Sequence, residues 1–305
     1  MNRSPAIIIG ILASTLACGI SAEPSLLKEE MVIKATSDGR PMFEYRYAPD
    51  VAFKPYIFQL YSPGGVPILR DAPVDHIHHH GLMFAVGVND ETFWEEVIKG
   101  AIVGGHQIPR QTDVTGNLIT QQLDWQNRSG DIVLHETRTI QPLENPDATL
   151  LTWRCRLETP PGKDAVNLFG HPYYGLGARL LESMDKVATF MNSSGQPGEI
   201  IGGDHRLVPA TWVACTGPTA DGKMVTIAIF DHPDNLRYPS QKFTMAVPFA
   251  YISTTLNWKE PLQLKAGEPL DLCYGVAVWD GAVQAEQIEK AFRKWQENTP
   301  NNPQR

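Results

Sequence analysis

The sequence is short of cysteine, with four in 305 residues. Cys18 falls in the amino-terminal segment, which leaves Cys155, Cys215 and Cys273 for the rest of the chain. Three cysteines are too few for a disulfide framework, and no CxxC or zinc-ribbon spacing occurs. Two arrangements stay open: one bridge with a free thiol, or three buried free thiols.

The sequence also lacks an excess of positive charge. Its 34 Asp and Glu outnumber its 26 Lys and Arg, for a formal net charge of −8. Nucleic-acid-binding proteins usually carry a basic patch, so this balance disfavours a nucleic-acid partner. A phosphate-cradling glycine loop, a serine nucleophile elbow and an HExxH motif are absent too. Nucleotide binding, serine-triad hydrolysis and zincin proteolysis therefore lose support.

Long apolar runs are missing except at the amino terminus. Arg3 and the apolar residues 6–16 resemble the charged and hydrophobic regions of an export signal, and residues 20–22 (Ile-Ser-Ala) offer a cleavage site. We predict a signal peptide over residues 1–22 and an exported protein, periplasmic or extracellular. Lipid anchoring through Cys18 is the alternative. No later segment is long and apolar enough to span a bilayer.

A β pattern runs through almost the whole chain. Apolar and polar residues alternate over residues 151–158, which is the period of a half-buried strand. Turn-forming clusters separate other segments rich in aromatic and β-branched residues, namely 42–47, 54–61, 118–125, 131–140, 224–230 and 270–279. Only residues 283–298 show apolar residues at helical spacing. We predict a single all-β domain over residues 23–305, a large antiparallel sandwich with this terminal helix.

Four of the nine histidines lie within five positions, next to a carboxylate. Imidazole is the side chain best suited to bind metal or transfer protons near neutral pH. In an extended backbone His76, His78 and His80 would share one face and leave His79 on the other. With Asp75 they form a candidate set for a divalent metal, and the same histidines could act as general acids and bases. A histidine-rich surface loop is the structural alternative.

A second polar group lies within residues 169–179. His171 follows a predicted strand, Tyr173 lies two residues on, and Arg179 offers a bidentate fork for a carboxylate or for sugar hydroxyls. The alternative for a histidine at a strand end is a structural hydrogen bond.

A third polar group consists of Asp231, His232 and Asn235, where a predicted strand ends and a loop begins. Loops on a rigid scaffold often carry functional residues. Simple turn formation is the alternative, because Asp, Pro and Asn all favour turns.

These motifs together resemble an uncharacterised bacterial family catalogued as methane oxygenase PmoA. The similar motifs are Asp-His-x-His-His-(Arg or His)-Gly-Leu at residues 75–82 with Phe-Trp at 93–94, Gly-Leu-Gly-x-Arg at 175–179, Asn-Ser-x-Gly at 192–195 and His-Pro-x-Asn at 232–235. The resemblance covers residues 30–298 and implies characteristic polar positions at His76, His78, His79, Arg179 and His232. It does not imply a methane monooxygenase, because the monooxygenase subunit of that name is an integral membrane protein and this chain has no predicted span.

More distantly, the chain is similar to aldose 1-epimerases (galactose mutarotases). Residues 79–81 (His-His-Gly), 170–176 (Gly-His-Pro-Tyr-Tyr-Gly-Leu) and 264–270 follow the order and spacing of that family's motifs. The resemblance implies a galactose mutarotase-like β-supersandwich, with His171 in the place of the general acid. The family's Asn before this histidine is Gly170 here, and its catalytic Glu has no clear counterpart. The fold is therefore implied more strongly than the reaction.

We expect an exported enzyme that acts on a sugar or glycoside by histidine-mediated acid–base chemistry, as an epimerase, lyase or hydrolase. The alternatives are a non-catalytic carbohydrate-binding protein and a metal-binding or redox protein with a histidine site. The candidate catalytic residues are His76, His78, His79, His171 and His232. The candidate substrate-binding residues are Arg179, Trp94, Tyr173, Asp231 and Asn235. The expected partner is a small molecule or glycan, and the candidate ligands for a divalent metal are Asp75, His76, His78 and His80.

Overall fold

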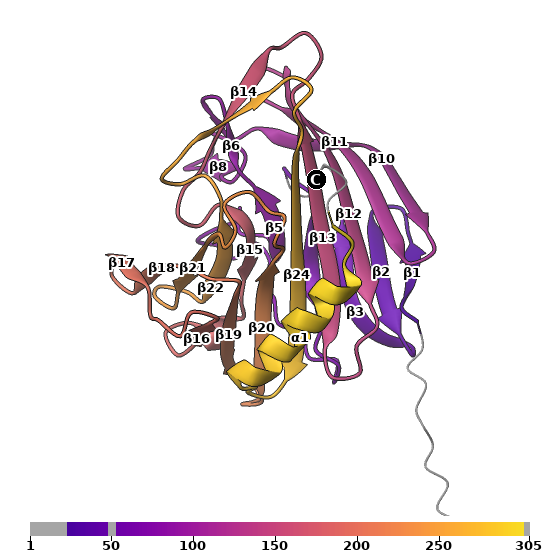
Figure 1. The fold of residues 1–305 in the computed structure, drawn as a ribbon, viewed down its shortest axis with the longest axis vertical. Helices are drawn as coiled ribbons and strands as arrows, with labels where there is room; N and C mark the ends of the chain where they lie inside the picture. Colours follow the sequence, from indigo (N-terminus) through magenta and orange to yellow (C-terminus); the bar gives the residue numbers. More distant parts are fainter. Residues whose placement is uncertain (1–22, 48–52, 302–305) are drawn as a thin grey trace, which may run out of the picture.

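The computed structural model describes residues 23–47 and 53–301, and the predicted signal peptide with Cys18 lies outside them. Within these ranges the chain forms antiparallel β-sheets, one α-helix and the short 3₁₀ helix η1 (Glu182–Met184) (Figure 1). The prediction of a large antiparallel β-sandwich with a carboxyl-terminal helix is confirmed.

Ten strands form the larger sheet. In spatial order they are β1 (Ser25–Lys28), β2 (Val32–Ser37), β3 (Arg40–Arg46), β4 (Tyr56–Leu60), β5 (Leu82–Ala85), β15 (Gly175–Arg179), β22 (Tyr251–Thr255), β21 (Gln241–Met245), β18 (His205–Pro209) and β17 (Glu199–Gly202).

Eight strands form the second sheet. In spatial order they are β10 (His106–Thr115), β11 (Leu118–Gln126), β12 (Ile132–Leu143), β13 (Thr149–Glu158), β24 (Leu270–Asp280), β20 (Met224–Asp231), β19 (Trp212–Pro218) and β16 (Thr189–Asn192). Each strand predicted by its residue range has its counterpart in one of these two sheets.

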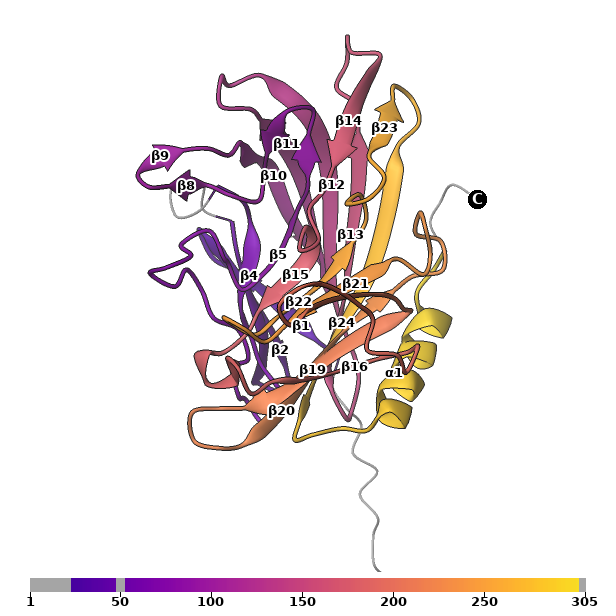
Figure 2. The ribbon, with the colours of Figure 1, turned by 90° about the vertical axis from the view of Figure 1, so that its left-hand side faces the viewer.

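Two small sheets complete the fold. One contains β23 (Leu262–Lys265), β14 (Ala165–Phe169), β6 (Gly87–Val88) and β7 (Glu91–Thr92). The other is the hairpin of β8 (Val97–Ile98) and β9 (Ala101–Ile102), which projects from the body of the molecule (Figure 2).

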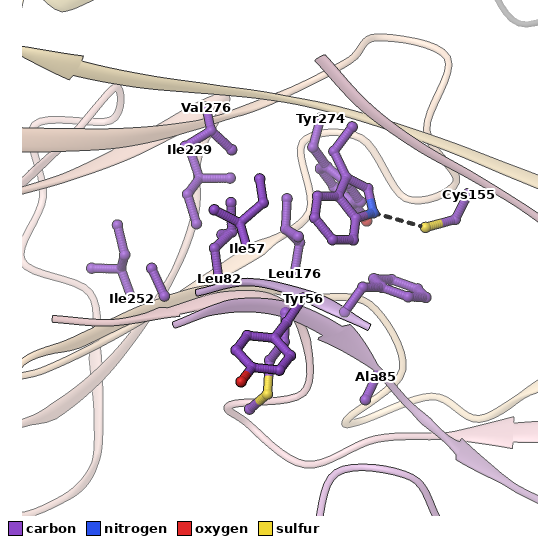
Figure 3. Close-up of a cluster of buried hydrophobic side chains, with 14 of the residues drawn as sticks. Tyr56, Ile57, Leu82, Ala85, Cys155, Leu176, Ile229, Ile252, Tyr274 and Val276 are labelled. Carbon is purple, nitrogen blue, oxygen red and sulfur yellow. Dashed lines mark hydrogen bonds between the residues drawn. The ribbon is translucent and has the colours of Figure 1, made fainter. Parts of the chain in front are cut away.

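Apolar side chains from the two large sheets fill the space between them (Figure 3). The ten-stranded sheet contributes Ile57, Leu82, Leu176 and Ile252, and the eight-stranded sheet contributes Ile229, Tyr274 and Val276. Full burial of one such aliphatic side chain stabilises the fold by about 1.5–3 kcal/mol. Because side chains alternate along a strand, every second residue of the ten-stranded sheet faces away from this core.

The helix α1 (Ala285–Asn298) packs on the outer face of the eight-stranded sheet (Figure 1). A capping box between Gln284 and Gln287 begins it. Ile288, Phe292 and Trp295 recur at helical spacing and are buried against the sheet. The helix predicted over residues 283–298 is confirmed, with its start two residues later.

The three cysteines of the described chain, Cys155, Cys215 and Cys273, are buried free thiols. Of the two arrangements left open by the sequence, the structure has the one without a bridge. In the part of the chain that the structure describes, no helix is long and apolar enough to cross a bilayer.

Candidate functional site: an aromatic pocket with a histidine cluster

A pocket of about 490 Å³ lies on the face of the ten-stranded sheet that is turned away from the sandwich core. Loops before β5, after β7 and before β15 build one side of it, and β17, β18, β21 and β22 build the other. The wall consists of His76, His78, His79, Trp94, Glu95, Ile98, Pro172, Tyr173, Ile201, His205, Phe243, Met245, Pro248, Phe249, Tyr251 and Trp258. Six aromatic side chains, four histidines and one carboxylate therefore face a common space.

Strand alternation aims the aromatic wall outward. In β22, Ile252 faces the core (Figure 3), so the preceding Tyr251 faces the pocket. In β21, Phe243 and Met245 face it by the same rule. The neighbouring strand β15 carries Gly177 beneath this ring, where a Cβ atom would lie 1.8 Å from the Tyr251 hydroxyl. Glycine at this position lets Tyr251 lie across the sheet.

The histidine segment folds as two successive turns. The amide of His76 donates to the Pro73 carbonyl and that of His79 to the His76 carbonyl, both at 2.9 Å. These turns place His76, His78 and His79 in the pocket wall. His80 lies behind that wall, where its ring contacts Glu96. The predicted shared face of His76, His78 and His80 is therefore wrong, because hydrogen-bonded turns set the side-chain directions. We call His76, His78 and His79 the histidine cluster.

The rings of the histidine cluster lie against one another. The centroid of His79 is 4.6 Å from that of His78 and 4.7 Å from that of His76, and Phe249 lies 5.0 Å from His79. Burial, helped by the charge of Lys54, lowers the pKa of His78 to about 4. Burial, helped by the neighbouring histidines, lowers the pKa of His79 to about 2. Both imidazoles are thus neutral at pH 7, and each can accept one proton.

Glu95 is the carboxylate of this pocket. Its Oε2 accepts hydrogen bonds from the Tyr174 hydroxyl at 2.6 Å and from Thr92 Oγ1, and its Oε1 accepts one from the Tyr173 hydroxyl at 3.2 Å. Burial works to raise the pKa of Glu95, but these hydrogen bonds outweigh it and hold the pKa below its usual range. The carboxylate is therefore ionised. No sequence motif singles out Glu95, because Tyr173 and Tyr174 approach it only in the folded chain.

Behind the pocket, a buried chain of charges links its two loops. The Nδ1 of His80 lies 2.9 Å from Asp71 Oδ1, and its Nε2 lies 3.2 Å from Glu96 Oε2. Lys54 pairs with Glu96 and donates to the Trp94 carbonyl at 3.1 Å. Burial would raise the pKa of Glu96, but Lys54 holds it at about 2. We call Asp71, His80, Glu96 and Lys54 the buried brace, because it ties the residue after His79 to the residue after Glu95.

Three buried nitrogens of the pocket wall make no hydrogen bond among the described residues: Nδ1 of His76, which lies 3.1 Å from Asp75 Oδ2, Nδ1 of His79 and Nε1 of Trp94. A buried polar group without a partner costs about 1–3 kcal/mol. Ordered water or a bound ligand usually satisfies such groups. Trp94, predicted to bind substrate, is thus placed with a free indole N–H beside the histidine cluster, and the predicted Tyr173 lies in the same wall.

Arg179 lies behind the pocket wall. Its Cζ is 3.7 Å from the centre of the Phe249 ring, and its Nη2 is 3.6 Å from Asp185 Oδ2. Burial lowers the pKa of Arg179 to about 10, so it stays charged at neutral pH. The guanidinium supports Phe249 from below, and a substrate would touch it only after displacing that ring.

His171 is exposed and does not line the pocket, although the next two residues do. Its ring lies 5.6 Å from Tyr173 and 5.1 Å from Tyr174. The structure thus places His171 on the outer side of the two tyrosines that hold Glu95.

The third predicted group lies apart from the pocket. Asp231 Oδ2 is 3.0 Å from Lys242 Nζ, and both side chains are fully buried. Asn235 Nδ2 donates to Asp231 Oδ1 at 2.7 Å and to the Cys273 carbonyl at 2.7 Å. His232 is buried with its ring 5.7 Å from Trp295 of the terminal helix. These are the contacts of a structural network, and the structure does not bring Asp231, His232 and Asn235 to the histidine cluster.

The four candidate metal ligands are also separated. His76 and His78 face the pocket, His80 belongs to the buried brace, and Asp75 Oδ2 lies 3.1 Å from His76 Nδ1. Over residues 23–47 and 53–301, no three His, Cys, Asp or Glu side chains are grouped as metal ligands. A divalent cation at His76 and His78 stays a prediction. If the prediction is right, elemental analysis should find near-stoichiometric metal in tag-free wild-type protein. The His76→Ala/His78→Ala variant should have lost it.

A family model described as "Family of unknown function (DUF6807)" matches residues 32–293. No curated protein matches the sequence. Similar solved structures include a proposed mutarotase, YeaD, from Salmonella typhimurium (10% identity, 85% of this chain and 94% of that chain, TM-score 0.42). A second is a galactose mutarotase related enzyme from Lactobacillus acidophilus (10% identity, 86% of this chain and 98% of that chain, TM-score 0.38). A third is a 4-alpha-glucanotransferase from Thermococcus litoralis (12% identity, 86% of this chain and 40% of that chain, TM-score 0.36). At these identities the likeness concerns the fold alone, and the resemblance to PmoA stays a prediction.

Proposed function

Since this chain belongs to the family of unknown function DUF6807, we propose a function from its site: an exported carbohydrate-active enzyme that transfers protons on a sugar with His78 and Glu95. The observation that carries the proposal is the pairing of neutral imidazoles with an ionised carboxylate in one aromatic pocket. Glu95, rather than the exposed His171, is the partner of His78 in this proposal.

The part of the pocket wall beside the histidine cluster and Glu95 suits a sugar ring. Aromatic faces such as those of Trp94 and Tyr173 can pack on the C–H faces of a sugar, while nearby polar atoms bind its hydroxyls. The partnerless nitrogens of His79 and Trp94 offer two such atoms. Together they would hold the ring beside the acid–base pair.

Each member of the pair has the protonation state that its role needs. The ionised Glu95 accepts a proton from the substrate and, once protonated, returns it later in the cycle, and Tyr173 and Tyr174 fix its orientation. His78 is neutral, so it takes up a proton at one nitrogen while its other nitrogen keeps its own, and the imidazolium formed in this way gives that proton back to the sugar. Epimerisation, elimination and hydrolysis all use such transfers, and positioned groups of this kind accelerate a reaction by about 10²- to 10⁴-fold.

A product screen tests this function. Tag-free protein is incubated with a panel of monosaccharides, glycosides and oligosaccharides, and products are followed by NMR and mass spectrometry. We expect at least one member to change with wild-type protein and to stay unchanged with protein carrying both His78→Ala and Glu95→Gln. Binding without any product would favour the carbohydrate-binding alternative. If no member binds or changes, the proposal is wrong.

On the acidic side of the pH profile, the activity should fall at an unusually low pH. The pH dependence of kcat/KM reports groups of the free enzyme. Burial holds the pKa of His78 at about 4 instead of 6.5, so the neutral base persists in mildly acidic solution. We expect kcat/KM to stay level down to about pH 5 and to fall through about pH 4. A limb centred near 6.5 would mean that a solvated histidine carries the reaction.

A further inference from the structure

The pocket has a polar end, and most of the rest of its wall is apolar, with His205 and Trp258 as exceptions. The histidine cluster and Glu95 form the polar end. Tyr251 lies in the middle, because its ring centroid is 6.3 Å from that of His79 and 6.1 Å from that of Phe243. Apolar side chains make up much of the remaining wall, and we call Ile98, Ile201, Phe243 and Met245 the apolar wall; the ring of His205 lies 5.6 Å from that of Phe243. None of these four side chains has a nitrogen or oxygen atom that could pair with a sugar hydroxyl, so the apolar wall favours an apolar group.

One member of the apolar wall is open to solvent. Ile98 lines the pocket and is 45% exposed, and Ile201 is half-buried. An exposed apolar side chain in a pocket wall is available to a ligand.

The charges of the pocket restrict the charge that the ligand can carry. The wall, as the described residues form it, contains no lysine or arginine, and Glu95 is ionised. Arg179 is shielded by Phe249. A uronate or a sulfated sugar would therefore meet a like charge without a counter-ion, so an uncharged ligand is favoured.

From these observations we infer that the substrate is an uncharged glycoside whose apolar, ring-sized aglycone packs on the apolar wall while its sugar lies at the histidine cluster. This inference rests on the proposed function. A pocket of about 490 Å³ is within the range of sites that enclose small organic ligands. The aglycone would cover Ile98, which is 45% exposed, and the half-buried Ile201.

Matched pairs of ligands test the inference. Methyl and phenyl β-D-glucosides, galactosides and xylosides are titrated into tag-free protein by isothermal calorimetry. At least one phenyl glycoside should bind about tenfold or more tightly than its methyl partner, because the phenyl ring adds buried apolar area. The Ile98→Ser/Ile201→Ser variant should bring that ratio close to one. Ile102→Ser is the control, since Ile102 lies on the same hairpin, is 55% exposed and does not line the pocket.

Each other outcome has a distinct meaning. Equal affinity for the methyl and phenyl partners, together with turnover of a glycoside that is lost in His78→Ala protein, overturns the inference and leaves the proposed function standing. Binding of free phenol without any glycoside overturns both, because the pocket would then be an apolar site without a sugar end. If no probe binds, the inference is wrong, and the product screen alone decides the proposed function.

Discussion

His78→Ala protein should turn over its substrate about 10²- to 10⁴-fold more slowly than wild type, with the loss in kcat. The substitution removes the neutral imidazole that exchanges a proton with the sugar. His78 is only partly buried and lies in a turn, so the fold should persist. Circular dichroism and the thermal midpoint check the fold, and steady-state kinetics on the glycoside found in the product screen check the rate.

Glu95→Gln should cause a loss of similar size, because the amide keeps the shape but cannot accept the proton. Two groups that act as a unit are not additive, so the double variant should be little slower than the worse single one. His135→Ala and Glu91→Gln are matched controls. His135 bonds Asp124 on the far sheet, and Glu91 pairs with Arg128, both outside the pocket. Full activity in His78→Ala protein would remove the histidine cluster from the mechanism.

The largest stability effect should come from Lys242→Met, which should lower the free energy of unfolding by about 3–5 kcal/mol. Lys242 and Asp231 form an ion pair in which neither side chain is exposed. Asp231 also accepts the backbone N–H of Ser240 at 2.7 Å, so the carboxylate cannot turn away when its cation is lost. An unpaired buried charge then remains in the folded state. Urea unfolding with an unchanged m-value measures the difference.

The same experiment decides what Asp231 does. If it is structural, Lys242→Met protein that is still folded should keep wild-type kcat/KM. The Asp231→Leu/Lys242→Met double variant should recover part of the lost stability, because no unpaired charge is left. If Lys242→Met protein instead keeps wild-type stability but loses turnover, Asp231 is a substrate-binding residue, as the sequence predicts.

The strands were predictable because their signal is local. A period of two over residues 151–158 and a helical period over 283–298 each arise from one face packing on the core. The membership of the histidine cluster was only partly predictable. The sequence predicts His76, His78 and His79 as site residues. It does not predict that His80 lies outside the pocket, because the groups that His80 contacts, Asp71 and Glu96, are distant in sequence.

The residues that complete the pocket could not be found from local motifs. Tyr251 and Phe243 lie on adjacent strands that reach the pocket only through sheet pairing. Asp231 and Asn235 form a convincing local motif, yet their partners Lys242 and Cys273 make it part of the interior. In each case a long-range contact decides whether a polar residue serves the site or the fold.

The buried brace has a consequence for how the protein meets its ligand. It fixes the separation of the histidine cluster and Glu95 through atoms that no ligand in the pocket touches. The acid–base pair is thus preorganised, and binding does not have to assemble it. Structures with and without a glycoside should superimpose at these two loops, with rearrangement confined to the Phe249 ring and the β8–β9 hairpin. Changes in the apolar wall could then alter which aglycone is accepted while the chemistry stays the same.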